Sequence, residues 1–151
     1  MSASESRVLR VEVTDRPIGA SALALQVSCP RAGAIATFEG VVRDHHQGKR
    51  VAHLEYEAYA PMAEKVLREV AEEAVGRWPI EALALAHRFG RLEIGEVSVA
   101  IAVASAHRGD AFDALRYTID ELKSRVPIWK RETGPDGSHW IEGPDTIPTG
   151  T

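Results

Sequence analysis

Hydrophobic and polar residues alternate along several short segments of the chain, and this period of two predicts β-strands. One such segment covers residues 7–13, and a longer one runs from Gly33 to Arg43. Further alternating segments lie at residues 54–58, 80–89 and 97–103. In the last of these, valine and isoleucine occupy one face and alanine the other, so it is the strongest strand prediction.

Three other segments show helical spacing. A short apolar helix is expected from Pro17 to about Val27, and a second helix from Pro61 to the break at Pro79. The third has a buried stripe at 3-4-3-4 spacing, formed by Phe112, Leu115, Ile119, Leu122 and Val126. Strands outnumber helices and mix with them irregularly, which predicts the α+β class.

The remaining segments complete the predicted organisation. Residues 44–50 are wholly polar and predict a mobile loop, and Gly90 and Gly95 bracket a turn. A hairpin is expected around residues 134–137, between strands at 128–132 and 138–142. Since no linker interrupts the chain, residues 1–143 are predicted to form a single domain, followed by a disordered tail at 144–151.

Composition and charge exclude several classes of function. The 151 residues carry a formal net charge of −4, so a nucleic-acid footprint over the whole surface is not expected and any cationic site is local. Neither a signal peptide nor a membrane span is evident. The single cysteine, Cys29, rules out an internal disulfide and indicates a reducing compartment. We therefore expect a cytoplasmic protein.

A cluster of cations surrounds Pro127 near the C-terminal end. Proline ends the preceding helix, so Lys123 belongs to its last turn, and Lys130 lies beyond the break on an extended segment. Two amines from two elements could thus converge on one anionic or electrophilic substrate. Their spacing also fits a helix-end charge and a strand-edge charge. Ile128 and Trp129 favour the chemical interpretation, because an apolar setting makes a lysine amine usable.

Two further groups of cations are candidates for binding an anion. His107 and Arg108 precede a predicted helix start with Asp110 as its N-cap, where backbone N–H groups attract anions. Arg43 ends a predicted strand and could clamp a phosphate. A solvated loop explains the first group equally well, and for Arg43 an ordinary surface arginine is the default explanation. The six histidines lack metal-ligand spacing, so neither a metal nor a cofactor is expected.

Several of these stretches occur together in one known family. The landmarks include Phe38–Arg43, Tyr56–Ala63, His87–Gly90, Gly95-Glu96, His107-Arg108, Leu122-Lys123, Pro127–Glu132 and Asp136-Gly137 with Trp140. In this order, from Gly33 to about Gly143, they resemble the large, catalytic subunit of molybdopterin synthase, the MoaE family. The resemblance implies an α/β-hammerhead fold with an additional antiparallel β subdomain.

The resemblance also implies a function. The family is a sulfurtransferase that converts cyclic pyranopterin monophosphate into molybdopterin by installing two sulfurs. The donor is a thiocarboxylate on the C-terminal Gly-Gly of a small ubiquitin-like subunit, and two large subunits form the centre of a heterotetramer. Cys29 lies outside every charged cluster, which agrees with sulfur being delivered by a partner.

Residue roles follow from the same resemblance. Lys123 would act at the thiocarboxylate and Lys130 on the pterin, as the catalytic pair. Phosphate and pterin would be held by Arg43, His107 and Arg108, with Arg131 and Glu132 lining the pocket and Val41 and Val42 supplying wall contacts. The alternatives are a non-enzymatic scaffold for a ubiquitin-like partner and a phosphate-ester or nucleotide-binding enzyme.

Overall fold

The computed structural model describes residues 7–141 and contains a mixed four-stranded sheet at its centre. Its strands are β1 (Val8–Thr14), β2 (Ala34–Val41), β6 (Ile80–Arg88) and β8 (Val97–Ser105), in the order β1-β6-β8-β2. β1 runs parallel to β6, whereas the other pairs are antiparallel. The predicted α+β class is confirmed. The predicted tail, residues 144–151, and the domain limit at residue 143 lie outside the described residues.

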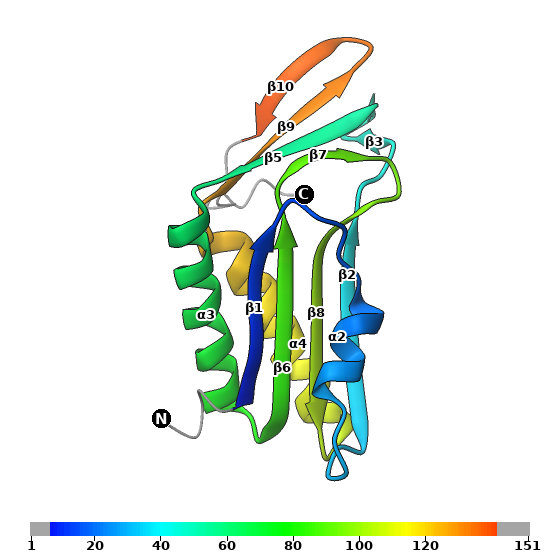
Figure 1. Ribbon diagram of the computed structural model, residues 1–151. Helices are drawn as coiled ribbons and strands as arrows, with labels where there is room; N and C mark the ends of the chain where they lie inside the picture. The colour runs from blue at the N-terminus through cyan, green and yellow to red at the C-terminus, as the bar shows by residue number, and fades with distance from the viewer. Residues whose placement is uncertain (1–6, 142–151) are drawn as a thin grey trace.

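Helices cover both faces of this first sheet (Figure 1). On one face, α2 (Ala20–Val27) packs against the alanines of β6 and β8, whose small side chains let the helix approach closely. On the other, α3 (Ala60–Arg77) and α4 (Arg108–Arg125) pack against the branched residues of the same strands. Both strands are therefore buried on both faces. No described helix combines the length and apolarity that a membrane span needs.

An ion pair joins α3 and α4 beside their apolar contact. The Arg125 guanidinium binds both carboxylate oxygens of Glu73, at 2.7 and 3.0 Å, and Tyr117 donates to the same carboxylate. These hydrogen bonds lower the pKa of Glu73 to about 2. The predicted buried stripe of α4 needs one correction, because Phe112 is 60% exposed and the neighbouring Ala111 takes the buried position.

A second sheet lies across one end of the first (Figure 1). It contains β5 (His53–Ala58), β7 (Gly90–Glu93), β9 (Ile128–Gly134) and β10 (Gly137–Ile141), in the order β10-β9-β5-β7. All of its pairs are antiparallel, as the resemblance implied for the added β subdomain. The predicted β9–β10 hairpin is confirmed. The turn expected between Gly90 and Gly95 instead begins with the short strand β7.

The polar segment at residues 44–50 is a hairpin rather than the mobile loop that its composition predicted. Strands β3 (His45–His46) and β4 (Lys49–Arg50) are joined by a two-residue turn. Gln47 and Gly48 both have positive φ there, 51° and 78°, which matches the twist of a tight hairpin. The sequence signal was weak because Gln-Gly is a less common pair at this turn than Asn-Gly.

Candidate active site

The hinge between α4 and β9 forms as the sequence predicted. α4 ends at Arg125, the N–H of Val126 donates to the carbonyl of Leu122 at 3.1 Å, and β9 begins directly after Pro127. Lys123 is exposed in the last helical turn, and Lys130 is partly buried on β9. The two amines therefore come from two different elements at the junction of the sheets.

The pairing of β9 with β5 determines what surrounds Lys130. Lys130 is directly opposite Tyr56, so both side chains lie on the same face of the second sheet. Ile128 shares this face because it is two residues away, and it is buried. Trp129 lies on the opposite face, so the apolar setting predicted for Lys130 comes from Ile128 and Tyr56 rather than from Trp129.

Arg131 and Glu132 are neighbours on β9, so their side chains lie on opposite faces of the second sheet. Within a single chain, the two side chains therefore do not line the same pocket. On the face of Lys130, Glu132 pairs with His46 of the hairpin, with 2.8 Å between Oε2 and Nδ1. On the other face, Arg131 binds Glu55 at 2.6 Å and lies over the ring of Trp140. The hydrogen bond from Arg131 lowers the pKa of Glu55.

Tyr56 and His87, which served in the sequence only as landmarks of the resemblance and not as predicted site residues, meet where the two sheets join. The rings of Tyr56 and His87 meet edge to face, 5.5 Å apart between centroids. Burial raises the pKa of the Tyr56 hydroxyl, whereas it lowers that of His87 to about 4, and the positive charge of Lys123 acts in the same direction on His87. The available signal was a histidine inside the apolar run of β6.

Arg43 lies at the same end of the first sheet as the hinge. β2 ends at Val41, two residues earlier than predicted. Arg43 therefore lies in the segment that follows β2, and its side chain is exposed. Val42 is buried among apolar residues of the second sheet, and its N–H donates to the carbonyl of Glu96 at 3.0 Å. Val41 is 51% exposed. The two predicted wall residues thus have different surroundings.

His107 and Arg108 lie at the other end of α4. His107 is the N-cap residue and Arg108 the first helical residue, so the predicted N-cap, Asp110, is instead in the first turn. The N–H of His107 donates to the Ser105 hydroxyl at 3.1 Å. A hollow of about 490 Å³ adjoins both side chains and is lined by Gly33, Ala34, Ala106, His107, Arg108 and Gly109.

The candidate residues therefore form two groups rather than one. Lys123, Lys130, Glu132 and Arg43 are near the junction of the sheets, whereas His107 and Arg108 lie at the far end of a helix of 18 residues (Figure 1). At 1.5 Å per residue such a helix is about 27 Å long. A single small substrate cannot contact both groups of the same chain.

The described residues contain no group of three histidine, cysteine or carboxylate side chains placed to hold a metal ion. Cys29 is half-buried just after α2 and forms no disulfide, on the opposite side of the sheet from α4. What the junction can do chemically depends on its amines, which can stabilise anions and transfer protons.

The family model of the MoaE protein matches residues 13–125. The molybdopterin synthase catalytic subunit of Halalkalibacterium halodurans is 47% identical over 132 residues, covering 87% of this chain and 85% of that protein. The protein of the same name from Arabidopsis thaliana is 45% identical over 142 residues, 94% of this chain and 72% of the other.

Solved structures show the same likeness. Molybdopterin synthase from Staphylococcus aureus superposes with a TM-score of 0.83 and 40% identity, covering 88% of this chain and 97% of that one. The MoaE protein of Burkholderia ambifaria gives a TM-score of 0.76 and 38% identity, with 93% and 94% covered. Since the family model spans most of the chain and relatives of nearly half identity cover almost all of it, this chain belongs to the MoaE family.

Proposed function

We propose that this protein is the catalytic subunit of a molybdopterin synthase and acts as a sulfurtransferase on cyclic pyranopterin monophosphate. The observation that carries the proposal is the pair of lysines on two elements at the junction of the sheets, where Lys130 lies opposite Tyr56 and Tyr56 contacts the ring of His87. Both the substrate's phosphate and the donor's thiocarboxylate are anions. Because Lys123 and Lys130 belong to separate elements, each can bind one of the two anions while both anions are held close enough to react.

Each lysine has a distinct task in this proposal. Lys123, exposed at the end of α4, polarises the thiocarboxylate of the sulfur donor. Lys130, partly buried opposite Tyr56, stabilises negative charge that develops on the pterin or transfers a proton to it. Because a thiocarboxylate that gives up its sulfur ends as a carboxylate, water supplies the replacing oxygen at each of the two transfers.

We infer two partners for the chain. The first is a small ubiquitin-like subunit that carries the thiocarboxylate on a C-terminal Gly-Gly. A protein from Helicobacter pylori with the same fold, 19% identical with a TM-score of 0.70, was solved as a complex of subunits 1 and 2 of molybdopterin-converting factor. The second is another copy of this chain, whose His107 and Arg108 would complete the site, since those of the same chain are too far away.

The proposal is tested by incubating the purified chain with thiocarboxylated small subunit and pterin precursor, followed by mass analysis for the dithiolene product. Replacing either lysine, as Lys123→Ala or Lys130→Ala, should lower turnover by about 10²–10³-fold, because each removes a charge that acts in the transition state. Lys65→Ala, an exposed lysine on α3, is the matched control and should retain full turnover.

The outcome separates this function from its rivals. A wild-type protein that forms no dithiolene refutes the proposed function. Normal turnover in one lysine variant removes that lysine from the mechanism. A scaffold for a ubiquitin-like partner would bind that partner equally well with and without the lysines and would form no product.

A further inference from the structure

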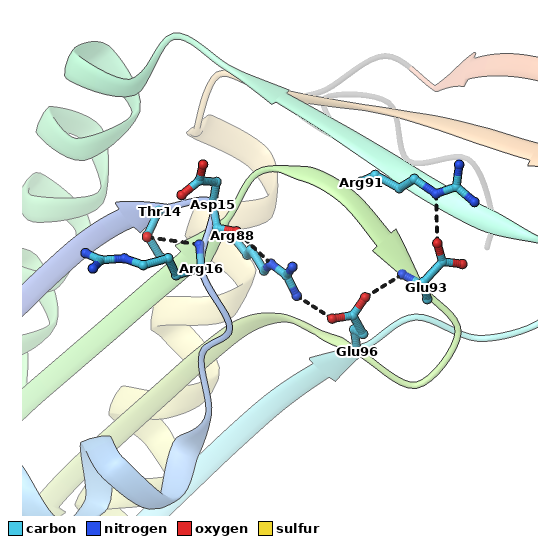
Figure 2. A network of polar contacts seen from close by, with 7 residues as sticks. All are labelled: Thr14, Asp15, Arg16, Arg88, Arg91, Glu93 and Glu96. Carbon is cyan, nitrogen blue, oxygen red and sulfur yellow. Dashed lines mark hydrogen bonds and ion pairs between the residues drawn. The ribbon is translucent and has the colours of Figure 1, made fainter.

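The turn between β7 and β8 is fastened to the end of β6 by the side chain of Arg88, the last residue of that strand. Its guanidinium donates to a carboxylate oxygen of Glu96 at 2.6 Å and to the carbonyl of Asp15 at 3.3 Å (Figure 2). The Arg88 side chain is 12% exposed, whereas that of Glu96 is 35% exposed. Because a guanidinium loses free energy on leaving water unless its donors have partners, this placement depends on the Glu96 carboxylate.

The second oxygen of the same carboxylate closes the turn. It accepts from the N–H of Glu93 at 2.8 Å, while the N–H of Glu96 donates to the carbonyl of Glu93 at 3.1 Å. The hydrogen bonds from the Glu93 N–H and from Arg88 lower the pKa of Glu96, so its carboxylate is ionised at physiological pH. Hydrogen bonds to an ionised acceptor are about twice as strong as those between neutral groups. We call the Arg88 guanidinium, the Glu96 carboxylate and the Glu93 N–H the turn bracket.

This turn holds the segment that follows β2. The carbonyl of Glu96 accepts from the N–H of Val42 at 3.0 Å, and the N–H of Gly95 donates to the carbonyl of Val42 at 2.8 Å. Both backbone polar groups of Val42 are therefore bound to the turn. Its side chain is buried in one apolar cluster with Leu92 of β7. The position of Val42 thus follows from the position of the turn.

Arg43 is the next residue along the chain, and its position depends on these backbone contacts. Its side chain is exposed, and within residues 7–141 neither a hydrogen bond nor an ion pair holds its guanidinium. On its other side, the carbonyl of Asp44 accepts from the N–H of Val51 at 2.8 Å. Two backbone anchors, Val42 before Arg43 and Asp44 after it, therefore determine the direction in which the arginine side chain leaves the backbone.

We propose that Glu96 and Arg88 are positioning residues for Arg43: the turn bracket fixes the turn, and the turn fixes the backbone from which the Arg43 side chain reaches the substrate's phosphate. The inference rests on the proposed function and on the phosphate-binding role that the resemblance implies for Arg43. An arginine binds a phosphate through two parallel hydrogen bonds, which require a defined direction of approach. A fixed backbone supplies part of this direction before the substrate arrives, which lowers the entropy lost on binding.

Calorimetric titration with cyclic pyranopterin monophosphate tests the inference. Glu96→Ala and Arg88→Gln each break the turn bracket, and we expect either change to raise the Kd of the precursor about 10-fold. Arg91→Gln is the matched control. Arg91 pairs with Glu93 on β7 at 2.8 Å, but both side chains are more than half exposed, and the substitution leaves the turn bracket intact. The Kd of this control should stay within about twofold of wild type.

A double-mutant cycle separates positioning of Arg43 from a general effect on the fold. Arg43→Ala should weaken precursor binding by itself, and adding Glu96→Ala to it should raise the Kd no further, because the turn bracket then has no arginine to position. With saturating precursor and donor, the kcat of Glu96→Ala should equal that of wild type, so that the defect is confined to KM. The proposal is overturned if the effects of the two substitutions on Kd multiply, if Glu96→Ala leaves Kd unchanged, or if it lowers kcat with KM unchanged.

Amide hydrogen exchange tests the turn bracket without a ligand. In Glu96→Ala, the N–H groups of Val42 and Gly95 should exchange about 10-fold faster than in wild type, relative to the N–H of Leu85 in the middle of β6, which reports unfolding of the whole domain. Unchanged exchange at Val42, or an equal acceleration at all three, would overturn the proposal. A wild-type chain that binds no precursor would instead refute the proposed function, and the exchange rates would still decide whether Glu96 fixes the segment that carries Arg43.

Discussion

The buried imidazole of His87 makes the stability of the protein depend on pH in a defined window. Its pKa is about 4 in the folded state against 6.5 for an exposed histidine, so between these values the unfolded chain binds a proton that the folded chain does not. The free energy of unfolding should therefore fall on acidification from pH 6.5 to 4, by on the order of 3 kcal/mol in total. Urea unfolding at a series of pH values measures this fall.

His87→Phe is the control for that titration, since it removes the titrating group and keeps an aromatic ring. The variant should show a much flatter dependence between pH 6.5 and 4.5. The lowered pKa of Glu73, about 2, contributes only further down, as its carboxylate is protonated below pH 4.5. Parallel curves for the two proteins would show that His87 is not buried in the neutral form.

Among the elements, the β3–β4 hairpin depends on one close approach to β9. A Cβ added at Gly134 would lie 2.1 Å from the carbonyl oxygen of Arg50, a backbone atom that cannot rotate away. The neighbouring N–H of Ala52 donates to Thr133 at 2.7 Å, so the hairpin is held against this strand. We expect Gly134→Ala to displace the hairpin and to lower the free energy of unfolding by about 1–3 kcal/mol, measured by chemical denaturation.

Gly76→Ala is the matched control for that substitution. Gly76 lies in α3, and an added Cβ there meets no atom within 4 Å. Alanine should stabilise the helix by about 0.5–1 kcal/mol. If both alanine variants change stability alike, the contact between Gly134 and Arg50 does not determine the position of the hairpin.

The elements that the sequence predicted well are those with strong periodicity. The alternation in β8, the helical spacing in α3 and α4, and the break at Pro127 each identify their element. β7 was missed because only Leu92 of its four residues is buried, which leaves no alternation to detect. Phe112 was misplaced because an aromatic residue near a helix end can stay exposed while a smaller neighbour takes the buried position.

Candidate site residues were harder to predict than helices and strands. The spacing of residues along the sequence does not give the distance in space between side chains of different elements. Lys123 and Lys130 were identified from the hinge that separates them. Tyr56 and His87 were not predicted as chemical groups, because each lies in a segment whose pattern indicates only a strand. The two rings are in contact only because the two sheets meet.

At the scale of the whole molecule, the length of α4 separates Arg108 from Lys130, and the separation can be tested by complementation. In a mixed dimer of Arg108→Ala and Lys130→Ala chains, one shared site would carry both defects and the other none. We expect such a dimer to recover about half of the wild-type turnover, although each variant alone is impaired. Co-expression with two different affinity tags isolates the mixed dimer for the assay.

The two variant homodimers are the controls, since every site in them carries a single defect. If each site were built within one chain, every site of the mixed dimer would also carry one defect. Turnover no higher than that of the homodimers would then exclude a site shared between subunits.

The parallel pairing of β1 also has a consequence for how the chain folds during synthesis. β1 is the first described strand to leave the ribosome, but its partners are residues 83–88 of β6, which follow several seconds later at about 5–20 residues per second. It lies at an edge of the sheet and carries the neighbouring opposite charges of Arg10 and Glu12. Charges on an edge strand discourage pairing with other chains. These two charges therefore disfavour pairing of β1 with other chains until β6 has been synthesised.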